Sequence, residues 1–229
     1  MKSHMLAALA VTFLSLSGVA WAGELNRPLP APLIDPANNA RTETAVLAGG
    51  CFWGQQAIFE HVKGVSRVIE GYTGGSRATA TYEQVSAEDT GHAEAVEIRF
   101  DPRKVSYGTL LRIFFSVAHD PLQADGQGPD IGSSYRPAIF PTTPTQATTA
   151  AAYLAQLEAA HIFDGPIATK LEPFKGFFRA EEYHQDYLIH HPENLHIRQV
   201  EMPKLRAMKA VWPQYYRAAP ALAPRYLGP

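Results

Sequence analysis

Residues 44–54, TAVLAGGCFWG, predict a strand, a tight turn and the start of a helix in immediate succession. The apolar run 44–50 is typical of a buried strand and closes on a glycine pair. We expect a helix from Cys51, the only cysteine of the chain, to Gly64. Its apolar side would carry Ile58, Phe59 and Val62, and its polar side Gln56, Glu60 and Lys63.

The segments that follow extend this start into a known arrangement. Residues 65–72 and 136–140 are typical of strands, and 93–100 alternates so that Glu94, Val96, Ile98 and Phe100 share one face. Between them, Ser106 is expected to cap a helix with an apolar stripe that reaches Ala118. The order strand, helix, strand, strand, helix, strand predicts an α+β fold, the ferredoxin-like split βαβ plait of two layers.

Further segments enlarge this plait. A polar loop with three glycines covers 119–135, a length and composition that often carry function. We expect helices over 143–160 and 180–191, a strand over 169–174, and a long irregular C-terminal tail punctuated by prolines. Residues 23–42 are predicted to form an irregular lead-in, and 43–229 a single domain.

Composition narrows the possible functions. The chain has 229 residues, 46% of them apolar and 18% charged, as in an ordinary globular protein. A net charge of −2 provides no electrostatic case for a nucleic-acid or membrane-surface partner. A single cysteine rules out an intramolecular disulfide framework and any cysteine-rich metal site.

The N-terminus predicts export. A lysine, an apolar run and an A-x-A arrangement at Ala20 and Ala22 indicate a signal peptide over residues 1–22, cut after Ala22. The alternative is an uncleaved anchor, but the run 5–22 is at the short limit for a membrane span and contains hydroxyl side chains. No cysteine follows the run, which excludes a lipoprotein. The mature protein is therefore expected outside the cytoplasm, in a bacterial periplasm.

Cys51 could be either a packed core side chain or a reactive thiol. Free cysteines mostly pack as small hydrophobes. A cysteine at a helix start, however, lies beside unpaired N–H groups and the positive end of the helix dipole, so we expect a lowered thiol pKa. A Cys–His hydrolase would need a base such as His92 or His184, and a zinc site is less favoured still. His190, His191 and His196 are interpreted as solvated surface side chains.

Five segments together resemble one enzyme family. GGCFWG, TYEQVSAEDTGHAEAV, FFSVAHDP, SSYRPAIF and AEEYHQDYL are similar, in this order, to segments of the A-type peptide methionine-S-sulfoxide reductases. The resemblance extends from Thr42 to Arg217. It implies reduction of methionine-S-sulfoxide in proteins, and of the free amino acid, as repair after oxidative damage.

The resemblance also implies the role of each site residue. Cys51 would be the nucleophile that attacks the sulfoxide sulfur, and Glu94 the acid that protonates the sulfoxide oxygen. Tyr82 and Tyr135 would hydrogen-bond that oxygen, with Asp130 in the same site. Phe52 and Trp53 would receive the substrate methyl group.

Physical chemistry agrees with the acid role of Glu94. Sulfoxide oxygen is a poor leaving group unless protonated, so the acid needs a raised pKa. The alternation of 93–100 places Glu94 on the apolar face, and a nearby thiolate would couple to its titration. One departure is Ser134, which stands where the family often has glutamine.

The lone cysteine determines how the enzyme must be regenerated. The reaction leaves a sulfenic acid on Cys51, and no other cysteine is present to resolve it. We therefore expect no prosthetic cofactor and an external thiol: a thioredoxin-like protein, glutathione with glutaredoxin, or dithiothreitol in vitro. The enzyme is expected to be a monomer acting on oxidised proteins or peptides. Two alternatives remain, a Cys–His hydrolase and a non-catalytic module that binds methionine-rich surfaces.

Overall fold

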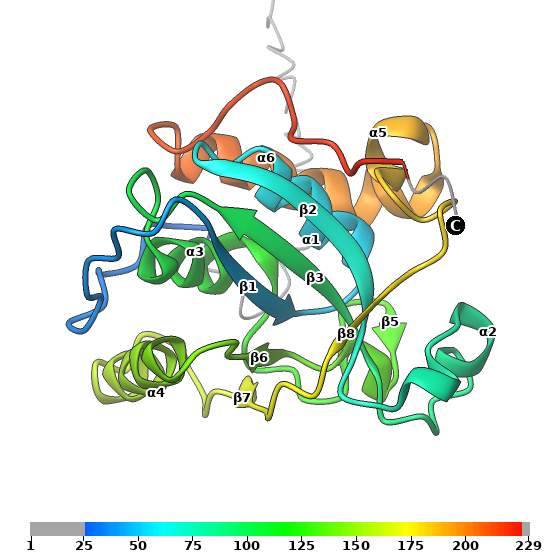
Figure 1. The fold of residues 1–229 in the computed structure, drawn as a ribbon, viewed down its shortest axis with the longest axis horizontal. Coiled ribbons are helices and arrows are strands. Elements are labelled where there is room, and N and C mark those ends of the chain that lie inside the picture. The colour runs from blue at the N-terminus through cyan, green and yellow to red at the C-terminus, as the bar shows by residue number, and fades with distance from the viewer. Residues whose placement is uncertain (1–25, 226–229) are drawn as a thin grey trace, which may run out of the picture.

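The computed structural model describes residues 26–225 and contains a mixed sheet of six strands in the order β7-β6-β1-β3-β2-β8 (Figure 1). Among the four central strands β6, β1, β3 and β2 each neighbouring pair is antiparallel, whereas the edge strand β7 runs parallel to β6. This central order is that of a ferredoxin-like plait, so the predicted fold class is confirmed. The strands are β1 (Glu43–Ala48), β2 (Val65–Thr73), β3 (Ala93–Phe100), β6 (Ala138–Phe140), β7 (Lys170–Leu171) and β8 (Phe177–Arg179), with a separate hairpin of β4 (Gly126–Gln127) and β5 (Asp130–Ile131).

The helices are α1 (Phe52–Glu60), α2 (Tyr82–Val85), α3 (Tyr107–Ile113), α4 (Pro144–Ala159), α5 (Tyr187–His190) and α6 (Met202–Val211). Helices α1, α3 and α4 contribute to the core on one face of this sheet, and α2 lies to one side of it (Figure 1). A π-helical turn, Phe114–Ala118, extends α3, and another, Ile197–Glu201, leads into α6. Ile58 of α1 and Leu110 of α3 pack with Val96 of β3 in the main core, whereas Val46 and Ala95 belong to a smaller cluster on the opposite face.

Two helix starts follow the predicted capping chemistry. The Ser106 hydroxyl accepts a hydrogen bond from the Thr109 N–H over 3.1 Å at the start of α3. Thr143 does the same for α4, with Pro144 in the first turn, where its missing N–H costs nothing. Both helices begin where the sequence predicted.

The described part of the lead-in is held against these helices. Residues 26–42 contain no helix or strand. The Tyr153 hydroxyl of α4 donates to the Pro30 carbonyl, and the Ser106 hydroxyl donates to Asp35. The predicted signal peptide, 1–22, lies outside the described residues. Within residues 26–225, every helix is too short or too polar to span a bilayer.

The polar side predicted for α1 is wrong at two of its three residues, since only Lys63 is exposed. Gln56 and Glu60 are buried, and the helix ends at Glu60 rather than near Gly64. The Gln56 side chain accepts from the Asp186 N–H over 2.7 Å and donates to the Val68 carbonyl. Later segments of the chain therefore cover a face that the local pattern indicated as solvent-exposed.

The C-terminal predictions also need correction. Of the helix expected over 180–191, only Tyr187–His190 is helical, after turns in which Asp186 adopts the left-handed region with φ 57°. The strand expected over 169–174 is confined to Lys170–Leu171. Instead of an irregular tail, Ile197–Val211 is helical, because Pro203 lies in the first turn of α6, where proline is tolerated.

Candidate active site

The turn that carries Cys51 is fixed by neighbours on both sides. Strand β1 leads into Gly49 and Gly50, and Gly50 has φ +92°, a conformation that favours glycine. A Cβ on Gly50 would lie 2.6 Å from Cβ of Gln127, in the polar loop. The Gln55 amide donates to the Gly49 carbonyl over 2.8 Å and to the Ala118 carbonyl over 2.6 Å. Cys51 is thereby placed at the N-cap of α1, with 6% of its surface exposed.

A cavity of about 160 Å³ opens at this turn. The structure brings all seven site residues proposed from the sequence to its walls, although they come from α1, α2, β3, β5 and the turn Ser133–Tyr135. One further residue, His196, completes the lining. The cavity is therefore assembled from segments far apart in the sequence: Cys51, Phe52, Trp53, Tyr82, Glu94, Asp130, Tyr135 and His196.

Glu94 lies on β3 with 4% of its surface exposed, facing the start of α1. Its Oε2 accepts a hydrogen bond from the Phe52 N–H over 3.1 Å. Burial raises the pKa of Glu94 to about 8; the Phe52 N–H opposes this shift, and the charges of Asp130 and Glu201 add to it. The carboxyl thus keeps its proton at neutral pH, as predicted from the strand alternation.

The prediction of a lowered Cys51 pKa is wrong. Burial raises the thiol pKa well above its usual value, and the charges of Glu201, Glu94 and Asp130 raise it further. The Trp53 N–H at the helix start acts in the opposite direction but is outweighed. The start of one helix therefore does not lower the thiol pKa enough to offset burial and the three carboxylates that other elements place nearby.

Tyr82 and Tyr135 are positioned by two half-buried carboxylates, Glu181 and Glu88. The Tyr82 N–H donates to Glu181 Oε1 over 2.9 Å at the start of α2. Glu88 accepts from the Ser134 N–H over 2.8 Å and from the Ser134 hydroxyl over 2.6 Å, which holds the turn that ends at Tyr135. The serine that departs from the family pattern is therefore an anchor. Burial raises the pKa of both phenols, so both remain hydrogen-bond donors.

The aromatic side of the cavity is organised around His184. The Trp53 indole N–H donates to His184 Nδ1 over 3.1 Å, and Trp53 stacks on Tyr187 with ring centroids 3.9 Å apart. The His184 ring also lies 5.0 Å from Phe52 and 4.6 Å from Tyr82, between centroids. Burial lowers the pKa of His184 to about 4, so this ring is neutral and holds the aromatic side chains in place.

His92 plays no part in the cavity lining. Its Nδ1 accepts from the Gly75 N–H over 3.3 Å, and its Nε2 lies 2.9 Å from the Ser76 carbonyl oxygen. Both ring nitrogens therefore serve the turn between β2 and α2. Neither histidine that a Cys–His hydrolase would have used is paired with Cys51.

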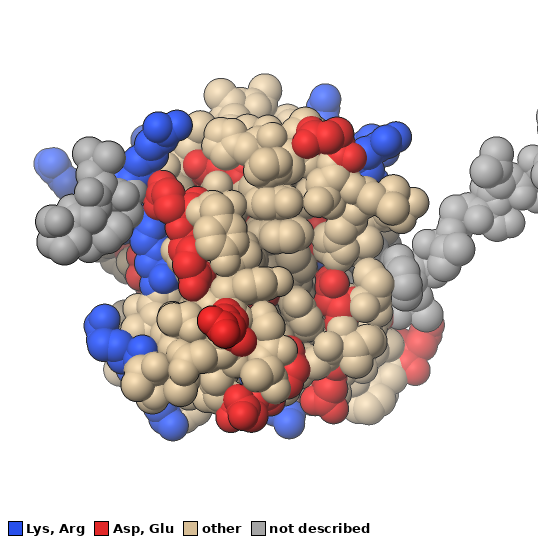
Figure 2. Space-filling view, turned by 90° about the vertical axis from the view of Figure 1, so that its right-hand side faces the viewer, with Lys and Arg blue, Asp and Glu red and all other residues tan. Residues whose placement is uncertain are grey.

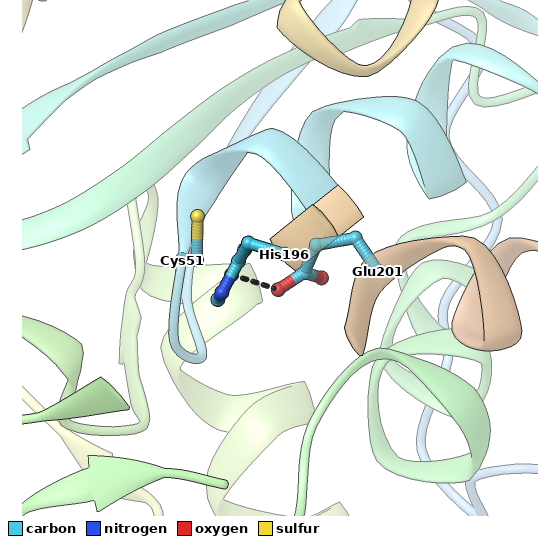
Figure 3. Close-up of side chains that lie close together, drawn as sticks. All are labelled: Cys51, His196 and Glu201. Carbon is cyan, nitrogen blue, oxygen red and sulfur yellow. Dashed lines mark ion pairs between the residues drawn. The ribbon is translucent and has the colours of Figure 1, made fainter. Parts of the chain in front are cut away.

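The C-terminal helical segment contributes residues that the sequence reading missed. His196 is half-buried rather than a solvated surface side chain. Its Nε2 lies 3.3 Å from Glu201 Oε1 (Figure 3), and 3.5 Å from Asp130 Oδ2. Glu201 is fully buried and pairs with Lys204 over 3.2 Å. A signal was present, because the buried positions repeat at helical spacing: Ile197, Glu201, Lys204, Met208 and Trp212.

These residues include the donor types of a metal site. Ligand atoms of Cys51, His196 and Glu201 all lie within 4.8 Å of one another. The Lys204 ammonium group, however, already lies beside the Glu201 carboxylate. That cation would compete with a bound metal ion, which disfavours a metal centre at this position.

Comparison with known proteins agrees with this geometry. The family model described as peptide methionine sulfoxide reductase matches residues 43–216. The chain is 49% identical to peptide methionine sulfoxide reductase MsrA 2 of Mesorhizobium japonicum over 79% of its own length and 93% of that protein. It is 50% identical to the MsrA 2 protein of Synechocystis sp., covering 80% of this chain and 88% of that protein.

The chain belongs to the peptide methionine sulfoxide reductase family. Among solved structures, it is similar to methionine sulfoxide reductase A of Corynebacterium diphtheriae, with a TM-score of 0.57, 30% identity and coverage of 78% of this chain and 89% of that one. It is also similar to Mxr1 from Saccharomyces cerevisiae in reduced form, with a TM-score of 0.59, 29% identity and coverage of 73% and 95%.

Family membership confirms the expected enzyme class and activity. The chain is an oxidoreductase of the methionine sulfoxide reductase type, which acts in protein repair. The comparisons favour this reading over the Cys–His hydrolase and the non-catalytic binding module. As a methionine sulfoxide reductase, the chain combines a buried thiol with a carboxyl that is protonated at neutral pH.

Proposed function

We propose that Cys51 is the nucleophile and Glu94 the proton donor in the reduction of methionine-S-sulfoxide. The observation that carries this assignment is the contact of Glu94 with the helix turn of Cys51, through the Phe52 N–H over 3.1 Å. The Cys51 sulfur bonds to the sulfoxide sulfur while the sulfoxide oxygen takes the Glu94 proton. The net step converts the thiol and the sulfoxide into a Cys51 sulfenic acid and methionine, a two-electron transfer.

Tyr82 and Tyr135 supply the hydrogen bonds to the sulfoxide oxygen in this proposal. Both side chains line the same cavity as Glu94 and keep their protons, so each can donate. Asp130 lines the cavity beside them. Phe52 and Trp53 form an apolar wall held by His184 and Tyr187, which suits the methyl group of the substrate.

Regeneration requires thiols from outside the chain, because Cys51 is its only cysteine. Two external thiols reduce the sulfenic acid to the thiol and leave as a disulfide plus one water. A thioredoxin-like protein, glutathione with glutaredoxin, or dithiothreitol in vitro could supply them. A peptide or protein that carries methionine sulfoxide is the second partner.

The surroundings of the cavity bear on the choice of reductant. On the face that carries α2, β5 and α5, acidic side chains lie across the middle and Lys and Arg side chains lie mostly at the margins (Figure 2). Such a field repels anionic thiols. We expect an uncharged dithiol such as dithiothreitol to outpace glutathione at equal thiol concentration, and the gap to narrow as salt is added. Equal rates at low salt would contradict this.

The nucleophile is tested with Cys51→Ser. We expect this variant to lose turnover of methionine-S-sulfoxide with dithiothreitol, while its fold remains unchanged by circular dichroism. Mass spectrometry of the wild type after one equivalent of sulfoxide, without reductant, should show one added oxygen on Cys51. Retained turnover in Cys51→Ser would remove the cysteine from the mechanism. Separate assays of the pure S and R epimers test the stereochemistry.

The N-terminal segment completes the proposal. We propose that residues 1–22 direct export to a periplasm and are removed after Ala22, so that the mature monomer begins at Gly23. The test is N-terminal sequencing of the protein from a periplasmic extract, with light scattering for its mass. A retained segment in the membrane fraction would indicate an anchor instead.

A further inference from the structure

Beside Cys51 lies a group of polar atoms without satisfactory partners. Among the described residues, Asp130 Oδ2, His196 Nε2 and Glu201 Oε1 are buried and make no hydrogen bond of good geometry. The two carboxylate oxygens lie 3.5 Å and 3.3 Å from the same His196 nitrogen. Buried polar atoms are rarely left unpaired, so such a group indicates a functional demand at this point.

Figure 3 shows how the group faces the thiol. Cys51 stands at the start of α1, and His196 projects from the C-terminal segment into the space between Cys51 and Glu201. The closest polar atoms of the three side chains all lie within 4.8 Å of one another. Glu201 itself contacts the backbone of α1 closely, because a Cβ on Gly54 would lie 1.6 Å from Glu201 Oε2. The histidine is therefore held at a fixed place relative to the sulfur.

The charges favour a proton on this histidine. Burial raises the pKa of Glu201, but Lys204 and His196 outweigh that effect and keep the carboxylate ionised. The Glu201 carboxylate, 3.3 Å from Nε2, raises the pKa of His196; burial opposes this, and the charge of Asp130 adds to it. Glu201 and Asp130 thus make the imidazole a better base than a free histidine.

The chemistry at Cys51 requires such a base. The thiol must lose its proton to attack, whereas Glu94 is needed as a donor and cannot serve as acceptor in the same step. Carboxylates near the sulfur disfavour the thiolate, while a protonated imidazole would stabilise it. The titratable and charged groups around the thiol come from α2, β3, β5, the turn before β6 and the C-terminal segment: Tyr82, Glu94, Asp130, Tyr135, His196, Glu201 and Lys204.

We propose that His196, positioned by Glu201 and Asp130, accepts the proton of Cys51 as the sulfur attacks. The S–H bond breaks, an N–H bond forms on the imidazole, and the freed electron pair bonds to the sulfoxide sulfur. Glu94 gives its proton to the oxygen, the S–O bond of the substrate then breaks as the hydroxyl moves to the Cys51 sulfur, and the bond between the two sulfur atoms breaks with its electron pair returning to the methionine sulfur. Proton exchange through solvent then returns the imidazolium proton to Glu94. This inference rests on the proposed role of Cys51 as nucleophile.

The test measures thiol reactivity without the sulfoxide. The rate of Cys51 alkylation by iodoacetamide is followed against pH in the wild type, His196→Gln and Glu201→Gln, with His190→Gln as the matched control. His190 is exposed and lies outside the cavity. We expect His196→Gln to lower alkylation at pH 7 by roughly 10²-fold and to move its midpoint to higher pH. Glu201→Gln should move it in the same direction by less, and His190→Gln should follow the wild type.

Chemical rescue separates catalysis from structure. In His196→Ala, added imidazole should raise the single-turnover rate in proportion to its concentration, because the side chain is replaced by its own functional group. A purely structural histidine would not respond. If circular dichroism shows that His196→Gln does not fold, the role of His196 is tested by the alkylation profile of Glu201→Gln and by imidazole rescue of His196→Ala.

The outcomes that would overturn the proposal are distinct from failure of the proposed function. An alkylation profile of folded His196→Gln identical to that of the wild type removes His196 as the base, and so does His196→Ala that gains nothing from imidazole. Either result, together with an inactive Cys51→Ser, leaves the nucleophile in place. An active Cys51→Ser would instead overturn the function itself.

Discussion

At the scale of single residues, the protonation state of Glu94 depends on two opposing effects: the loss of solvent around its carboxyl and one hydrogen bond to it. Only 4% of its surface remains exposed. Burial, which raises the pKa, outweighs the hydrogen bond from the Phe52 N–H, which stabilises the carboxylate and lowers the pKa. A carboxyl with a pKa of about 8 is protonated below that pH and ionised above it. The acid role is therefore restricted to neutral and lower pH.

Glu94→Gln tests this directly. We expect its single-turnover rate to fall by about 10²- to 10⁴-fold, the usual contribution of a general acid. In the wild type, the rate should decline as the pH rises through about 8, because Glu94 then loses its proton. The variant should lack this decline. Rapid-quench kinetics against pH make the comparison, with Glu97→Gln on the other face of β3 as control.

An unchanged alkaline limb in Glu94→Gln would assign the titration to another group. Wild-type rates in Glu97→Gln are expected because Glu97 lies 3.6 Å from Arg67 at the surface, away from the cavity.

At the scale of elements, α1 and the C-terminal helical segment meet in a close contact between Gly54 and the Glu201 side chain. Gly54 has no side chain, and the Glu201 carboxylate occupies the space where a Cβ would be. Gly54→Ala should therefore displace Glu201 and with it His196, and lower the thermal unfolding temperature. Gly165→Ala is the matched control, because a Cβ there would meet Leu122 at an ordinary 3.7 Å.

The measurement for Gly54→Ala is a thermal scan followed by Cys51 alkylation at pH 7. Wild-type stability and alkylation in this variant would show that α6 can move without consequence for the site. A loss in Gly54→Ala that Gly165→Ala shares would point to a general effect of replacing glycine.

The start of α3 offers a separate test of local structure. The Ser106 hydroxyl caps the Thr109 N–H and donates to Asp35 of the lead-in. Ser106→Ala should lower the free energy of unfolding by about 0.5–2 kcal/mol, the usual cost of a lost cap. Urea unfolding measures the change, and Ser106→Asn should restore part of it. Equal stability of Ser106→Ala and the wild type would contradict the cap.

At the scale of the whole molecule, the buried acid Glu60, on the face of α1 that later segments cover, should make stability depend on pH. Burial raises the pKa of Glu60 from 4.5 to about 10; the neighbouring Asp186 carboxylate adds to the shift, and Arg217 opposes it. The folded protein therefore holds this proton between pH 4.5 and about 10, where the unfolded chain has lost it. Through this group, the free energy of unfolding decreases as the pH rises across that range.

Glu60→Gln removes the titration while keeping the shape of the side chain. We expect the variant to raise the unfolding temperature relative to the wild type at pH 9 and to change it less at pH 5. Differential scanning calorimetry at the two pH values measures this. The exposed Glu158→Gln serves as control. The same shift at both pH values would indicate a packing effect instead of a titration.

The sequence alone determined the order of the plait and, together with the family resemblance, every member of the cavity wall except His196. Alternation over 93–100 identified the buried face of Glu94, and the glycine turn identified the helix start at Cys51. These features are local, since a period of two and a turn residue act through their immediate neighbours. The resemblance to the family then supplied Tyr82, Asp130 and Tyr135, which no local pattern singles out.

Only the tertiary structure decided the electrostatics. The thiol pKa of Cys51 is raised, because carboxylates from β3, β5 and the C-terminal segment surround a sulfur that water scarcely reaches. Gln56 and Glu60 of α1 are also buried, and so are Glu201 and Lys204 of the C-terminal helical segment. In each case, segments distant in the sequence cover the side chain. Whether a charged side chain meets water depends on partners far along the chain, and a sequence pattern reports only the residues next to it.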